Sequence, residues 1–201
     1  MSKGMQTGLI ILGIVIILGI IIYNLTGGTY NRLVSLDEAA KSKWSIVEVS
    51  CQRRADLIPN LVETVKGYAK HEKDTLQAVV DARSRVGSMT VDPNMINNPE
   101  NFKKFQAAQG ELHDAISRLM VVVESYPQLK ANENFLQLQS QIEGSENRIA
   151  VARDRYNEAA QAFNTLKRSF PAFMIANMSG MQEKPYFQAE EGAKTAPKVK
   201  F

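Results

Sequence analysis

The sequence predicts an all-α protein with a single N-terminal transmembrane helix, followed by an antiparallel bundle of three long helices plus a short C-terminal helix. Three observations lead to this prediction. Residues 8–25 carry no charged side chain and are mostly Ile and Leu. Beyond them, apolar residues recur at spacings of three and four, as on one face of an α-helix. Prolines and polar capping residues mark the places where the helices are expected to begin and end.

The uncharged run at residues 8–25 is the predicted transmembrane helix. About 18 residues rising about 1.5 Å each cover roughly 27 Å, which is close to the hydrocarbon thickness of a bilayer. A cleaved signal peptide is the alternative, since Lys3 gives the run a positive flank, but no Ala-x-Ala-like site follows Ile22. We therefore expect a retained anchor, preceded by a short tail at residues 1–7.

Residues 26–31 predict a hinge between the anchor and the bundle. They include Gly27 and Gly28, and each glycine weakens a helix by about 1 kcal/mol. The helical bundle is then expected over residues 32–178.

The first long helix of the bundle is expected to run from Leu33 to Val86. Pro59 lies inside its apolar pattern and cannot donate a hydrogen bond to the Ala55 carbonyl, so a kink is predicted there. Gly67 is a second, milder weak point. Whether the helix continues through both positions is left open by the sequence.

Two further long helices follow. One opens with the cap Asn98 and Pro99 and continues to Tyr126. The next begins after the cap Asn132 and ends before Pro171, because proline disfavours helical geometry in the preceding residue. Its apolar residues recur every seven positions and predict a narrow buried seam: Phe135, Ile142, Ile149, Tyr156, Phe163 and Phe170. Residues 172–178 predict the short helix, and residues 179–201 a mostly flexible tail.

The lengths of these helices do not match. The first would be roughly 80 Å long, whereas the returning helix from Pro99 to Tyr126 covers only about 42 Å. The part near the membrane therefore carries an apolar stripe without an obvious partner, and exposed stripes of that length are unusual. Either the chain doubles back at Pro59 or Gly67 and covers the stripe, or the stripe pairs with other copies of the chain as a homo-oligomer. The stripe consists of Leu33, Leu36, Ala40, Trp44, Val47 and Cys51.

No catalytic, cofactor or metal site is predicted. His71 and His113 are the two histidines, and neither has a glutamate three residues before it, as helical di-metal sites require. Cys51 lies on the apolar stripe and is interpreted as a buried, inert thiol. Acidic and basic residues are interspersed and the net charge is only +3, so nucleic-acid binding is not expected.

Arg53, Arg54 and Asp56 are the charged residues singled out as a partner or ion-pair site. Arg54 falls on the apolar series, and a partly buried arginine normally finds a carboxylate. We expect a structural ion pair, with Asp56 or a carboxylate of a facing helix as the partner. Recognition of an anionic ligand or partner is the alternative.

The chain resembles the LemA family of bacterial membrane proteins. The resemblance is carried by Arg53-Arg54-Ala55-Asp56-Leu57-Ile58-Pro59-Asn60-Leu61-Val62, by Tyr30-Asn31-Arg32-Leu33-Val34, and by Tyr126-Pro127-Gln128-Leu129-Lys130-Ala131-Asn132. It extends from about residue 8 to about residue 187 and implies an anchored, mostly helical bundle. It brings no catalytic residues, because the family has no established enzymatic activity.

These observations predict a non-enzymatic scaffold or adaptor, anchored in the bacterial cytoplasmic membrane by one span. Its expected partners are the lipid bilayer and other envelope proteins, and self-association is an open alternative. The second hypothesis is a small sensory module that binds an envelope-derived ligand. The side of the membrane that holds the bundle is undecided, since Arg32, Lys41 and Lys43 favour the cytoplasm whereas the short basic tail favours the opposite.

Overall fold

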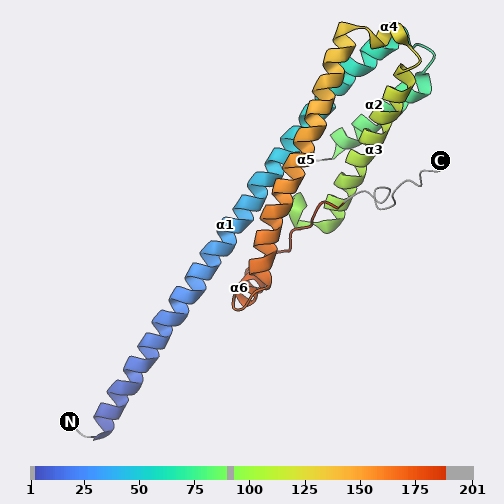
Figure 1. Ribbon diagram of the computed structural model, residues 1–201. Coiled ribbons are helices and arrows are strands. Elements are labelled where there is room, and N and C mark those ends of the chain that lie inside the picture. Colours follow the sequence, from blue (N-terminus) through green and yellow to red (C-terminus); the bar gives the residue numbers. More distant parts are fainter. Residues whose placement is uncertain (1–2, 90–92, 189–201) are drawn as a thin grey trace, which may run out of the picture.

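The computed structural model describes residues 3–89 and 93–188, apart from the side chains at positions 3, 5–7, 9, 10, 21, 22, 24, 25, 93 and 94. All regular secondary structure in this part of the chain is helical, so the predicted all-α class is confirmed. The helices are α1 Lys3–Tyr68, α2 Lys73–Ser88, the 3-10 helix η1 Pro93–Asn97, α3 Pro99–Val123, α4 Pro127–Lys130, α5 Glu133–Arg168 and α6 Ala172–Met178 (Figure 1).

The bundle is built around an antiparallel pair of long helices, α1 and α5, which lie side by side over the length of α5 (Figure 1). The shorter α2 and α3 pack on one another, and α2 also contacts the far end of α1. α6 packs against α1 and α5 at the opposite end of the bundle. This arrangement gives the molecule one end formed by the α1–α2 turn and α4, and another formed by α6.

The N-terminal half of α1 extends away from the bundle as a single helix (Figure 1). Its described large apolar side chains, from Ile11 to Ile20, are about half exposed. Residues 26–31, where the sequence predicts a hinge, are helical and continue α1. Glycines weaken a helix without removing a backbone hydrogen bond, and the turns on either side carry the helix through them.

None of the helices among the described residues is both long and apolar enough to span a membrane.

α1 continues through Pro59, where the sequence predicts a kink. Pro59 has no N–H to donate to the Ala55 carbonyl. That carbonyl instead accepts a hydrogen bond of 3.0 Å from Nε of Arg83 in α2. A side chain from the neighbouring helix thus replaces the missing intrahelical donor, which is how an interior proline becomes tolerable. The same bond fixes α2 against α1.

The helix expected from Leu33 to Val86 is two helices, because the chain turns back between Tyr68 and Lys73. This is the alternative in which the chain doubles back near Gly67. The apolar stripe is covered within one chain: Leu33, Ala40, Trp44, Val47 and Cys51 are buried and Leu36 is half-buried. These side chains are therefore not free to pair with another copy along the stripe.

The seam of α5 is the centre of the core. Phe135, Ile142, Ile149, Tyr156 and Phe163 are buried as predicted, whereas Phe170 is exposed, because α5 ends at Arg168 before reaching it. The buried apolar residues form three clusters along the bundle, centred on Leu61 and Leu119, on Trp44 and Tyr156, and on Leu33 and Phe163.

The tail predicted from residue 179 is described as far as residue 188, and residues 189–201 lie outside the described part. The segment 181–188 runs along α5 and is held by its polar side chains. Asn164 exchanges two hydrogen bonds with the backbone of Lys184, and Asn157 exchanges two with that of Phe187. The Phe187 ring packs among Trp44, Phe102 and Tyr156. Tyr186 and Phe187 are adjacent aromatic residues directly after Pro185, and they are the sequence signal that could have indicated this packing.

Candidate functional site

A groove lies between the C-terminal part of α1 and α2. It has a volume of about 550 Å³. Eight residues line it: Val62, Glu63, Lys66, Lys70, Lys73, Leu76, Gln77 and Val80. The sequence reasoning did not single out any of them as a site, because they come together only through the turn at residues 69–72.

Helical periodicity places these side chains on facing surfaces. Val62 and Lys66 are four residues apart on α1, and Lys73, Gln77 and the intervening Leu76 share one face of α2. The short connection between the helices holds the two faces next to each other, with Lys70 in the connection itself.

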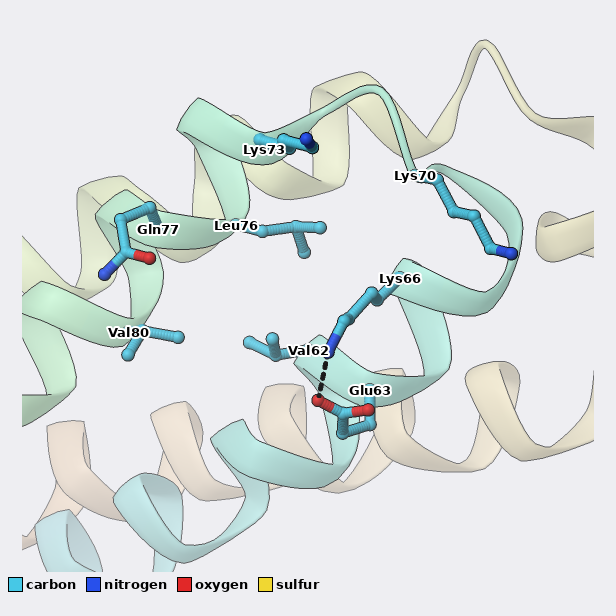
Figure 2. Close-up of a pocket in the computed structure, with 8 residues that line it drawn as sticks. All are labelled: Val62, Glu63, Lys66, Lys70, Lys73, Leu76, Gln77 and Val80. Atoms are coloured by element: carbon cyan, nitrogen blue, oxygen red, sulfur yellow. Dashed lines mark hydrogen bonds and ion pairs between the residues drawn. The ribbon is translucent and has the colours of Figure 1, made fainter.

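The groove has an apolar interior and a mostly basic edge. The side chains of Val62, Leu76 and Val80 face its middle, and the lysines lie around it (Figure 2). Val62 and Leu76 are buried. The acidic residue, Glu63, is 3.1 Å from Nζ of Lys66. Three lysines against one glutamate leave the groove with a formal charge of 3 − 1 = +2. Such a groove suits an anionic segment that also carries apolar side chains.

Arg54, predicted as an ion-pair residue, lies at the centre of the bundle with only 1% of its surface exposed. Its Nη1 is 2.5 Å from Oε1 of Glu146 on α5. Its Nη2 donates a hydrogen bond to the side-chain oxygen of Gln109 on α3. The partner is therefore a carboxylate of a facing helix, which is one of the two predicted alternatives, and the arginine joins three helices.

The other two residues of the predicted site do not join Arg54. Arg53 is exposed, and exposed Asp56 accepts a hydrogen bond of 2.7 Å from Nε2 of Gln52. The exposed His113 places Nδ1 3.4 Å from Oε1 of Glu146, at the outer edge of the Arg54 pair. With its guanidinium enclosed, Arg54 serves to fix the packing of α1, α3 and α5.

A second buried cation was missed by the sequence reasoning. Lys184 is 2% exposed, and its Nζ lies 2.5 Å from Oδ1 of Asp37 on α1. The same ammonium donates to Oδ1 of Asn97 and lies 5.0 Å from the centre of the Phe163 ring. Burial raises the pKa of Asp37, but the hydrogen bonds and charges of Lys184 and Lys41 outweigh burial and leave this pKa lowered. The pair ties the C-terminal segment to α1.

The possible metal-ligating side chains are dispersed in the described part of the chain. Within 3–89 and 93–188, no three His, Cys, Asp or Glu side chains lie close enough together to hold a metal ion. Both His71 and His113 are exposed.

Cys51 is buried in the Trp44 cluster, and burial raises the pKa of its thiol to about 11, against smaller opposite effects of Arg54 and Arg153. A rise from 9.0 to about 11 leaves about 100-fold less reactive thiolate at neutral pH. We expect the native chain to react with a disulfide reagent at least about 100-fold more slowly than the denatured chain.

A matched control for this expectation is a cysteine at exposed Val49, two residues away, in a Cys51→Ala background. It should react at the rate of a free thiol. If native Cys51 reacts as fast as this control, the stripe is not covered in the way described.

Comparison with known proteins adds the context of relatives. The model of the LemA family matches residues 43–201, in agreement with the resemblance carried by the sequence motifs. Magnetosome protein MamQ 2 of Paramagnetospirillum magneticum is 28% identical over 182 residues, which cover 83% of this chain and 67% of that protein. Protein LemA of Metamycoplasma hominis is 24% identical over 188 residues, covering 94% of this chain and 81% of that protein.

Proposed function

Because the chain belongs to the LemA family, we propose that it is a non-enzymatic, membrane-anchored adaptor whose basic groove binds an acidic amphipathic segment of another envelope protein. The anchor is the uncharged run at residues 8–25, in a single pass through the bacterial cytoplasmic membrane. The side that holds the bundle is left open.

The observation that carries the proposal is the position of the groove relative to that run. The run lies on α1 and one wall of the groove is formed by the same helix, which is continuous from Lys3 to Tyr68. From Leu25 to Val62 the helix rises roughly 55 Å. A groove at this height is out of reach of the headgroups of the anchoring bilayer, which extend only about 5–8 Å beyond the hydrocarbon. Its basic and apolar lining therefore fits a protein segment better than the lipid beneath it.

Two observations favour a binding function over catalysis. The family has no established catalytic role, and the side chains of Arg54 and Lys184 are buried in the bundle. These two cations hold helices and the C-terminal segment together. A bundle that presents an open groove far from its anchor is the arrangement expected of an adaptor.

The groove can be tested with a fluorescently labelled acidic peptide of about five helical turns, with leucines on one face and glutamates on the other. The full chain is held in lipid nanodiscs. We expect Lys70→Glu/Lys73→Glu to weaken peptide binding at least 10-fold, because two attractions become repulsions. Lys103→Glu/Lys104→Glu makes the same change of charge on exposed α3 residues that do not line the groove, and should leave the Kd within about twofold.

Two results would contradict the proposal. Equal weakening by both double variants would mean that the peptide responds to net charge alone. Equal binding of a peptide with the same composition in scrambled order would mean that the apolar interior of the groove is not used.

A ligand sensor is the second candidate, and the size of the groove favours it. A volume of about 550 Å³ falls within the range of roughly 300–1,000 Å³ found for small-molecule sites. An anionic single-chain amphiphile that raises the Tm of the wild-type chain, but not that of Lys70→Glu/Lys73→Glu, would support the sensor over the adaptor, since a ligand bound only to the folded state stabilises it.

A further inference from the structure

The end of the bundle opposite the groove carries an exposed apolar surface. It consists of the turn after α5 and the outer face of α6. Phe170 and Met178 are 81% and 88% exposed, and Phe173 and Met174 are about half exposed. The rings of Phe170 and Phe173 are 6.5 Å apart, so the two form one patch. Four large apolar side chains exposed within nine residues exceed what a solvated surface usually shows. We call these four residues the α6 tip.

α6 packs two alanines and the half-buried Ile175 on the core and turns its three other large apolar residues outward. Ala172 and Ala176 are buried against Leu33 of α1 and Phe163 of α5, whereas Phe173, Met174 and Met178 point away from the core. A helix that packs only on the protein core would be expected to bury more of these large side chains. This distribution is typical of a helix that contacts a second apolar phase on its outer face.

The position of α6 along α1 identifies that phase. Leu33, on which α6 packs, is eight residues beyond Leu25, the end of the uncharged run, and so about 12 Å along the helix. The headgroup layer occupies about 5–8 Å beyond the hydrocarbon. Figure 1 shows α6 at the end of the bundle from which the N-terminal half of α1 extends. This level lies just outside the headgroup layer when the run is in the membrane, so the side chains of an outward-facing Phe or Met are next to the lipid headgroups.

Two basic residues lie close in sequence to residues at this end of the bundle. Exposed Arg32 adjoins Leu33, and Lys167 lies in the last turn of α5, three residues before Phe170. Nη2 of Arg168 lies 2.6 Å from Oε2 of Glu183, so the negative charge of Glu183 is neutralised by this ion pair. Arginine and lysine next to exposed aromatic residues are favoured at the headgroup level, where phosphates can bind them.

We propose that the α6 tip is a second membrane contact, which touches the headgroup layer of the bilayer that holds α1. It rests on the membrane anchor of the proposed function. With two contacts instead of one, the bundle cannot tilt freely about α1, and the groove is held at a fixed height and direction.

The test measures membrane depth with spin labels in the full chain, reconstituted in vesicles of phosphatidylethanolamine and phosphatidylglycerol. In a Cys51→Ala background, single cysteines replace Phe170 and Met178, whose exposure makes the substitutions mild. Collision with lipid-soluble oxygen is compared with collision with a water-soluble nickel complex. Two reference labels are placed at Ile17 within the uncharged run and at Val121, an exposed apolar residue of α3.

We expect the ratio of oxygen collisions to nickel collisions to be several times higher for the labels at 170 and 178 than for the label at Val121. If the Ile17 label is in lipid while the labels at 170 and 178 match Val121, the α6 tip is not a membrane contact although the anchor stands. If the Ile17 label is itself in water, the anchor of the proposed function fails as well. Dipolar broadening between labels at 170 would show that two copies meet there, and would also overturn the proposal.

Discussion

Ile149→Asp is expected to unfold the bundle or to bring it close to unfolding. Ile149 is 2% exposed and packs in the same cluster as Trp44, Val47 and Cys51. The substitution removes an apolar side chain and buries an unpaired carboxylate, which together cost several kcal/mol out of a total stability of about 5–15 kcal/mol. Urea unfolding of the purified chain, followed by circular dichroism, measures the loss.

Arg155→Asp is the matched control on the same helix. Arg155 is exposed, so this substitution should cost less than about 1 kcal/mol. Similar losses from the two variants would mean that the face of α5 assigned to the core is wrong.

Asp37→Ala is expected to release the C-terminal segment and to lower stability by roughly 2–4 kcal/mol, because it leaves the buried ammonium of Lys184 without its carboxylate. Limited proteolysis should then cut within residues 181–188, which are protected in the wild-type chain by their contacts with α5. Stability is measured by urea unfolding, as above.

The double variant Asp37→Ala/Lys184→Met tests whether the unpaired charge of Lys184 causes the loss of stability. It removes both charges, and Met fills most of the volume of the lysine stem, so much of the lost stability should return. A double variant that is as unstable as Asp37→Ala would show that the charge of Lys184 is not what destabilises the single variant.

The same pair should give a dependence on pH. The pKa of Asp37 is lower in the folded chain than in the unfolded one, so its contribution is present above the unfolded pKa and is lost as the pH falls through the folded pKa. Between about pH 5 and pH 2 the wild-type chain should therefore lose more stability than the double variant.

The sequence by itself determined the helical class and most helix ends, since these depend on local chemistry. Asn98 accepts hydrogen bonds from the backbone of Glu100 and Asn101, and Asn132 accepts one from that of Phe135, as their capping positions indicate. The seven-residue spacing in α5 identified its buried face from Phe135 to Phe163. The family was also identified from short motifs.

The partners of the buried charges were not predictable in the same way. Arg54 and Glu146 are 92 residues apart, and several carboxylates were equally suitable in sequence. Lys184 lies in a segment whose composition resembles a flexible tail, and only its contacts with Asp37, Asn97 and Asn164 reveal that it is ordered. The groove likewise exists only because α2 folds back beside α1.

That reversal at residues 69–72 was the main feature that only the tertiary structure decided. The apolar pattern runs from α1 into α2 without interruption, because Val65 and Leu76 face the same core from opposite directions along the chain. Gly67 weakens the helix only mildly, and no strong helix-ending residue follows it. Local sequence therefore does not distinguish a continuous helix from one that reverses direction. The reversal is selected by what it buries, since α2 folded back on α1 and α3 covers apolar surface that a straight helix would leave in water.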